Sequence, residues 1–211
     1  PEPMSPANTC PTLHYKGEGY PDYALSGVPD FDQRQNAWQN PRTGQWSLDA
    51  PAAVANALWW HDSKFEQDYV MPPTIRDTYP LVQAYGRWDD HDPLNVSPLI
   101  EHLAREMDTD GRRSAAIKAG TTISDTLAGL ESYIRSKGLW ERYRIIAERQ
   151  PAFEWVSERI TRCNTVVLLL GYWEMQDGRW RRIGGHYVTA VGADAQNGVI
   201  AFSDPYRDHA E

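Results

Sequence analysis

The chain has 211 residues, a formal net charge of -8 and a hydrophobic fraction of 41%. This length suits one well-packed domain and is short for two. The acidic balance argues against a nucleic-acid partner, because binding a phosphate backbone needs clustered Lys and Arg. The longest apolar run, Val166-Val167-Leu168-Leu169-Leu170, has the length of a strand, so we expect no membrane span.

The first predicted helix runs from Ala50 to about Phe65. Its alanine-rich start is followed by Leu58, Trp59 and Trp60, which is typical of a central buried helix. A polar segment from Arg34 to Gln45 precedes it and is expected to form a loop that borders a cleft. Asp49 stands directly before the helix, where an aspartate is a preferred N-cap.

Three more helices are predicted from apolar spacing and terminal signals. They cover about Val96 to Met107, Ser124 to Lys137 and Phe153 to Thr161. A short strand is expected at Tyr143 to Ile146, between the last two of these helices.

The C-terminal part of the chain is predicted to form strands. Thr165 to Trp173 is the first, followed by a hairpin around Asp177-Gly178. Gly184 to Gly192 and Ala201 to Pro205 follow, with an Asn-Gly turn signal between them. Helices first and an antiparallel sheet afterwards indicate an α+β fold.

Two acidic segments raise the question of metal binding. Asp108-Thr109-Asp110-Gly111 looks like the start of a calcium loop, but two arginines follow at once, and the pattern lacks its later ligands. A turn in which aspartates bond backbone amides is the alternative. The cluster Asp89-Asp90-His91-Asp92 is expected to be a solvated loop, so we predict no metal and no cofactor.

Three short motifs occur in a defined order along the chain. They are Asp49-Ala50-Pro51-Ala52, Gly185-His186-Tyr187-Val188 and Asp204-Pro205. This order resembles the C39-like peptidase group of the papain-like cysteine peptidase superfamily, whose first motif starts with the nucleophilic cysteine. The resemblance implies a papain-like fold, in which an N-terminal helical part with a central buried helix packs on a C-terminal antiparallel sheet.

The same resemblance assigns roles to single residues. Asp49 occupies the position of the nucleophile, His186 that of the general base, and Asp204 that of the residue that orients the histidine. Gln33 is the candidate for the oxyanion hole. Gln35, Gln39 and Gln45 compete with Gln33 for that role.

The aspartate at position 49 decides the expected activity. A thiolate attacks a carbonyl, whereas a carboxylate is a far weaker nucleophile, and losing the nucleophile of a triad costs on the order of 10⁶ in rate. We therefore predict a catalytically inactive pseudo-peptidase that serves as an extracellular binding or assembly module. The alternatives are a hydrolase that uses Asp49 with His186 or another nucleophile such as Ser47, a cysteine peptidase altered at its nucleophile, and an Asp49 that is only a helix cap.

Tryptophan is abundant, with nine residues in the chain. Trp46, Trp88, Trp173 and Trp180 fall in or beside segments expected to rim the cleft. They are candidate anchors for a peptide or protein partner. Packing of the loops onto the body is the other interpretation.

The resemblance covers about Val28 to Asp208, so we expect a single domain over 28–211 after an extended arm or linker over 1–27. A further strand or domain beyond Glu211 stays open. Since the chain starts at Pro1, a signal peptide is expected to have been removed, and the family habit favours an extracellular or cell-surface location. Cys10 and Cys163, the only cysteines, would then form one disulfide; free thiols are the cytosolic alternative.

Overall fold

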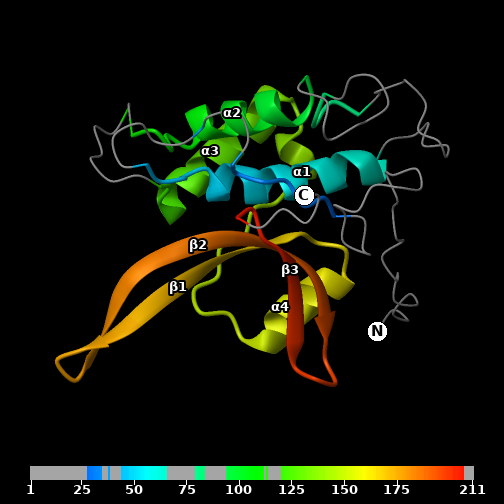
Figure 1. Ribbon diagram of the computed structural model, residues 1–211. Helices are drawn as coiled ribbons and strands as arrows, with labels where there is room; N and C mark the ends of the chain where they lie inside the picture. Colours follow the sequence, from blue (N-terminus) through cyan, green and yellow to red (C-terminus); the bar gives the residue numbers. More distant parts are fainter. Residues whose placement is uncertain are drawn as a thin grey trace.

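The computed structural model describes residues 28–34, 38, 44–65, 79–83, 94–111, 113 and 120–206, without the side chains of 63–65. Within these residues, three helices lie on one face of a three-stranded antiparallel sheet and a fourth lies on the other face (Figure 1). The prediction of an α+β fold is therefore confirmed. The expected arm over 1–27 lies outside the described residues.

Helix α1 (Asp49–Phe65) forms the centre of the helical layer. Its small side chains allow neighbours to approach closely, and every residue from Ala50 to Trp60 is buried. Trp59 is fully buried and meets the ring of Phe31 edge to face, with centroids 5.5 Å apart. The predicted central buried helix is confirmed.

Helices α2 (Val96–Glu106) and α3 (Ile123–Ser136) complete this layer. The main core lies among these helices and includes Leu99, Ile100 and Leu103 of α2. Gly129 of α3 lies so close to the end of α2 that a Cβ atom there would be 2.7 Å from the backbone of Glu106 and Met107. The glycine therefore sets how closely the two helices pack.

The sheet consists of β1 (Val166–Gln176), β2 (Arg179–Asp194) and β3 (Val199–Ser203), in the order β1-β2-β3. The turn between β1 and β2 is Asp177-Gly178, with φ values of 51° and 75°. Positive φ at both positions is what a type I′ hairpin requires. The expected turn at Asn197-Gly198 joins β2 to β3, with Gly198 at a φ of 65°.

The two faces of the sheet bury different helices. On one face, Tyr187 packs against Ala50 and Ala53 of α1, and Thr189 Oγ1 donates a hydrogen bond to the carbonyl of Ala53 at 2.7 Å. On the other face, α4 (Phe153–Thr161) packs its Val156 against β1 and β2. Strand β2 is thereby held from both sides, which fixes the position of its central residues.

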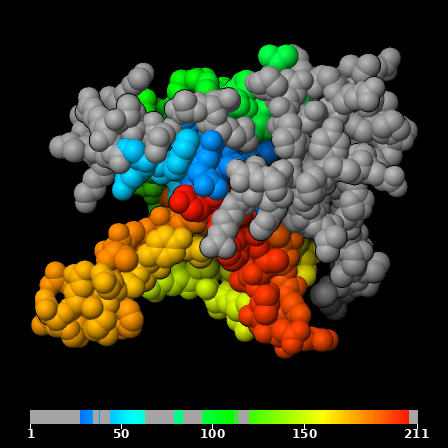
Figure 2. All heavy atoms as spheres, in the orientation of Figure 1, coloured from blue at the N-terminus to red at the C-terminus, as the bar shows by residue number. Residues whose placement is uncertain are grey.

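Beyond the body, β1 and β2 continue as a two-stranded ribbon, which we call the hairpin arm (residues 171–184). A bulge interrupts the pairing between Tyr172 and Trp173, and the ribbon then projects away from the helices (Figure 1). In the space-filling view the tip stands clear of the described part of the molecule (Figure 2). Its exposed large apolar residues are Tyr172, Trp173, Met175, Trp180 and Ile183.

One predicted element is wrong. The segment Tyr143–Ile146 is not a strand, although the backbone of Tyr143 is extended. It follows a short 3₁₀ helix, η1 (Trp140–Arg142), that the sequence did not indicate. Tyr143 and Ile145 instead pack against the helical core, and Tyr143 shares a hydrogen bond of 2.9 Å with the hydroxyl of Tyr79.

Among the helices described, none combines the length and the apolar character needed to cross a bilayer. Cys163 is disulfide-bonded. Cys10, the only other cysteine of the sequence, lies outside the described residues, so the pairing of the two stays a prediction.

Candidate functional site

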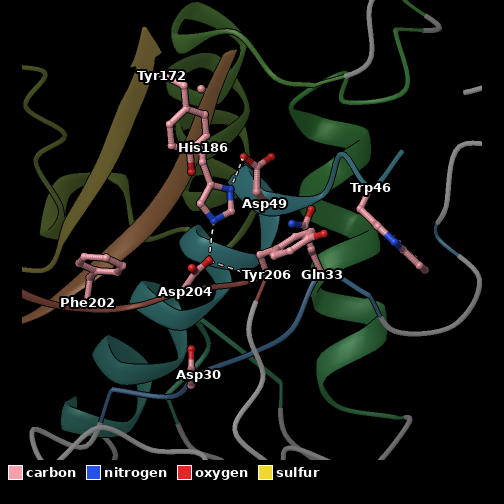
Figure 3. Close-up of a pocket in the computed structure, with 10 residues that line it drawn as sticks. Asp30, Gln33, Trp46, Asp49, Tyr172, His186, Phe202, Asp204 and Tyr206 are labelled. Carbon is pink, nitrogen blue, oxygen red and sulfur yellow. Dashed lines mark hydrogen bonds and ion pairs between the residues drawn. The ribbon is translucent and has the colours of Figure 1, made fainter. Parts of the chain in front are cut away.

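Three chain segments bring Asp49, His186 and Asp204 together. Asp49 is the first residue of α1, His186 lies in the middle of β2, and Asp204 directly follows β3. The imidazole Nδ1 lies 3.2 Å from Asp49 Oδ2, and Nε2 lies 2.5 Å from Asp204 Oδ1 (Figure 3). The histidine is thus held between two carboxylates, one at each ring nitrogen.

Backbone contacts fix both carboxylates. The amide of Tyr187 donates to Asp49 Oδ2 at 2.9 Å, since β3 ends opposite Thr189 and leaves this part of β2 unpaired on that side. The amide of Tyr206 donates to Asp204 Oδ1 at 3.0 Å. The hydrogen bonds that Asp49 makes with described residues therefore go to β2, and its side chain does not cap the amides of α1.

The two carboxylates determine the charge of His186. Burial alone would lower the pKa of the imidazole, but the hydrogen bonds and negative charges of Asp49 and Asp204 outweigh burial and raise this pKa above its ordinary value. When the imidazole carries both protons, each ring nitrogen donates to one of the two carboxylates.

Gln33 lies beside this triad (Figure 3). Its backbone N–H donates to the carbonyl of Pro205 at 2.8 Å, which ties the N-terminal segment to the chain that follows β3. The residue is only 3% exposed, and among the described residues no group donates to its side-chain oxygen Oε1. A buried acceptor without a donor is costly and indicates a place where a ligand group fits.

A buried hydrogen-bond network that the sequence did not indicate joins α1 to the end of β3 and to Asp30, next to the site. Asn56 of α1 is fully buried and accepts from the amide of Phe31 at 3.0 Å. Its Nδ2 donates to Ser203 Oγ at 3.0 Å, and Ser203 in turn donates to Asp30 Oδ1. A polar residue within an apolar helical run was the only signal in the sequence that could have found Asn56.

The triad opens into a pocket of about 680 Å³. The residues that line it are Asp30, Gln33, Trp46, Asp49, Tyr172, Gly185, His186, Phe202, Asp204 and Tyr206. The volume is in the range of sites that bind small molecules or single side chains with their flanking backbone.

The four tryptophans that were expected to rim the cleft do not all lie at the pocket. Trp46 lines the pocket, whereas Trp173 and Trp180 lie on the hairpin arm and are 56% and 66% exposed. Trp88 lies outside the described residues. The sequence missed Asp30, Tyr172, Phe202 and Tyr206, because nothing in their local patterns marks them.

Of the other candidates for the nucleophile and for the oxyanion-hole glutamine, those that the structure describes are not found at the pocket. Ser47 and Gln45 are described but do not line the pocket. Gln35 and Gln39 lie outside the described residues, so only Gln33 of the candidate glutamines is found at the site.

For metal binding, the carboxylate of Asp108 already has a partner. Its Oδ1 accepts from the amide of Arg113 at 2.7 Å, in a turn where Asp108 has a φ of 50°. The described part of the chain contains no group of three or more His, Cys, Asp or Glu that could hold an ion. Asp89, Asp90, His91 and Asp92 lie outside it, and the prediction of no metal, with calcium at Asp108 and Asp110 left open beside it, stays untested.

Comparison of the chain with family models, with curated proteins and with solved structures finds no match.

Proposed function

We propose that this protein is a catalytically inactive domain with a papain-like arrangement of its site, and that the pocket around His186 binds a peptide or protein partner. The observation that carries the proposal is the clamp on His186 by Asp49 and Asp204. In a working triad, one nitrogen of the base takes a proton from the nucleophile while the other is held by an orienting group. Here the nucleophile's place is taken by a second carboxylate.

This arrangement argues against catalysis through Asp49. Asp49 has no thiol or hydroxyl to attack an amide, and each ring nitrogen of His186 is already paired with a carboxylate. The same two carboxylates are held in position at the pocket, because each also accepts a hydrogen bond from a backbone amide. A site that is ordered and open but lacks a nucleophile is suited to binding.

We also propose an extracellular or cell-surface location. A disulfide-bonded Cys163 supports it, because such bonds persist in oxidising compartments.

The test is the Asp49→Cys variant, treated with a thiol-reactive electrophile and with a mixed peptide library. A thiol placed beside His186 should be labelled at pH 6 at least about ten-fold faster than an ordinary cysteine, because the imidazolium lowers its pKa. Ser47→Cys is the matched control, since it places a thiol two residues away and outside the pocket lining. In the Asp49→Cys/His186→Ala double variant, the fast labelling should disappear.

The unaltered protein should cleave nothing in the same library. Cleavage by the unaltered protein that is lost in Asp49→Asn would overturn the proposal and make Asp49 a catalytic carboxylate. Equal labelling rates for the Asp49→Cys and Ser47→Cys variants would show that the triad is not arranged as in a peptidase.

A further inference from the structure

The groups that line the pocket carry an excess of negative charge. Asp30, Asp49 and Asp204 are acidic, and His186 is the one basic residue among the lining side chains that the structure describes. Two arginines lie nearby without lining it. Arg34 pairs with Asp32 at 3.7 Å, and Arg182 donates to the carbonyl of Gly184 at 3.0 Å.

The contacts with His186 use only part of the acceptor capacity of these carboxylates. Asp49 accepts both of its hydrogen bonds at Oδ2, and Asp204 accepts both of its own at Oδ1. The second oxygen of each carboxylate makes no hydrogen bond to the described residues. A carboxylate has about four lone-pair sites, so both groups can still accept from a ligand.

Gln33 gives independent evidence for the kind of group that fits. Gln33 lines the same pocket, and its buried Oε1 receives no hydrogen bond from the described residues. Leaving such an acceptor unsatisfied is costly, and a ligand that brings a donor removes this cost. The pocket therefore favours a ligand rich in N–H donors.

Aromatic rings supply the walls. Trp46, Tyr172, Phe202 and Tyr206 line the pocket around the acidic groups (Figure 3). Planar cations stack well on such rings. The ring of Tyr206 already does this within the protein, because the guanidinium of Arg34 lies 4.7 Å from its centroid.

From these observations we propose that the pocket recognises a guanidinium group, namely the arginine side chain of a peptide or protein partner. A guanidinium offers five donors in a plane, which matches several acceptors between flat walls better than an ammonium does. The inference rests on the proposed binding function and specifies its ligand.

The experiment compares two peptides by calorimetry at low salt, acetyl-Gly-Arg-Gly-amide and the same peptide with citrulline, which has nearly the same shape but no charge. We expect the arginine peptide to bind at least ten-fold more tightly, with an affinity that falls as salt is added. A lysine peptide should bind more weakly than the arginine peptide.

Two variants locate the binding. Asp49→Asn and Gln33→Leu should each weaken arginine binding at least about five-fold, because each removes an acceptor or charge worth about one charge-assisted hydrogen bond. Glu131→Gln, on the exposed side of α3, changes the net charge as Asp49→Asn does and should leave binding unchanged. Circular dichroism of each variant ensures that only folded protein is compared.

The outcomes separate the two proposals. Equal affinity for arginine and citrulline peptides overturns the guanidinium site but leaves peptide binding intact. Binding of neither peptide, while Asp49→Cys is labelled rapidly, also overturns the guanidinium site and leaves the papain-like arrangement. Selective arginine binding, without rapid labelling of Asp49→Cys, supports the guanidinium site and contradicts the proposed arrangement.

Discussion

The Nδ1 atom of His186 lies 3.2 Å from Oδ2 of Asp49, so a charged hydrogen bond joins the start of α1 to the middle of β2. It raises the pKa of the imidazole together with the contact from Asp204. We expect NMR titration to place the pKa of His186 above the ordinary value of about 6.5. Asp49→Asn should lower this pKa, whereas Glu131→Gln should not change it; an unchanged value in both would show that the contact is absent in solution.

The same contact makes stability depend on pH. A histidine whose pKa is raised on folding stabilises the folded state fully below about pH 6.5, the unfolded value, and this contribution is lost as the pH rises through the folded value. The difference in thermal midpoint between the protein and its His186→Gln variant should therefore shrink with rising pH. Parallel midpoints across this window would contradict the ion pairs.

Asn56 is expected to contribute strongly to stability. Asn56→Ala removes the acceptor for the amide of Phe31 and the donor to Ser203, and it leaves a small cavity. Because a buried unsatisfied amide costs about 1–3 kcal/mol and the cavity adds to this, we expect a loss of about 3 kcal/mol in urea unfolding. Asn164→Ala, at an exposed residue whose side-chain amide bonds one carbonyl near the end of α4, should cost about 1 kcal/mol or less.

Gly129 is expected to resist substitution. Alanine has a better helix propensity than glycine by about 1 kcal/mol, so an unconstrained Gly129→Ala would stabilise α3. Its Cβ atom would instead lie 2.6 Å from Met107 Cγ and 2.7 Å from the adjoining backbone. We expect a net destabilisation of about 1–3 kcal/mol from overpacking, measured by thermal unfolding. A raised midpoint would show that α2 and α3 can move apart at little cost.

The disulfide can be tested directly. Mass spectrometry of an unreduced digest should find one linked pair of peptides containing Cys10 and Cys163. Cys163→Ser should destabilise the protein by about 2–5 kcal/mol, because the bond closes a long loop in the unfolded chain. Reducing agent should have the same effect on the unaltered protein and none on the variant. Linked dimers in the digest would contradict the intramolecular bond.

The elements predicted best are those marked by local signals. The alanine-rich run before Trp59 gave α1, and Asp177-Gly178 gave the β1–β2 turn, because each depends on neighbouring residues alone. Tyr143–Ile146 has equally suitable residues for a strand. A strand needs a neighbouring strand to pair with, however, and the described sheet contains only β1, β2 and β3. Whether a segment finds such a partner is not visible in its local sequence pattern.

The site was predicted in part for the same reason. Asp49, His186 and Asp204 stand in motifs whose order could be read directly, and the structure brings them into contact. Asp30 lines the pocket because Ser203, at the end of β3, donates a hydrogen bond to it, and Tyr206 lines the pocket because it follows β3. Both placements depend on tertiary structure, so the neighbouring residues in the sequence carried no signal. Trp173 was expected near the cleft because it falls in or beside a segment expected to rim it, but the arm projects away from the body from the bulge at Tyr172/Trp173 onward (Figure 1).

The bulge sets the direction in which the hairpin arm points, whereas the residues beyond the bulge set which side chains the arm presents. Ile183 is the extra residue on β2, and beyond it Trp173 pairs with Arg182 and Met175 with Trp180. Deleting Ile183 would keep these pairs but remove the local bend and the added twist that a bulge brings. The arm would then point along a new axis with the same surface. This deletion would weaken binding of a partner that contacts both the arm and the body. It would leave unchanged the binding of a partner that contacts only the side chains of the arm.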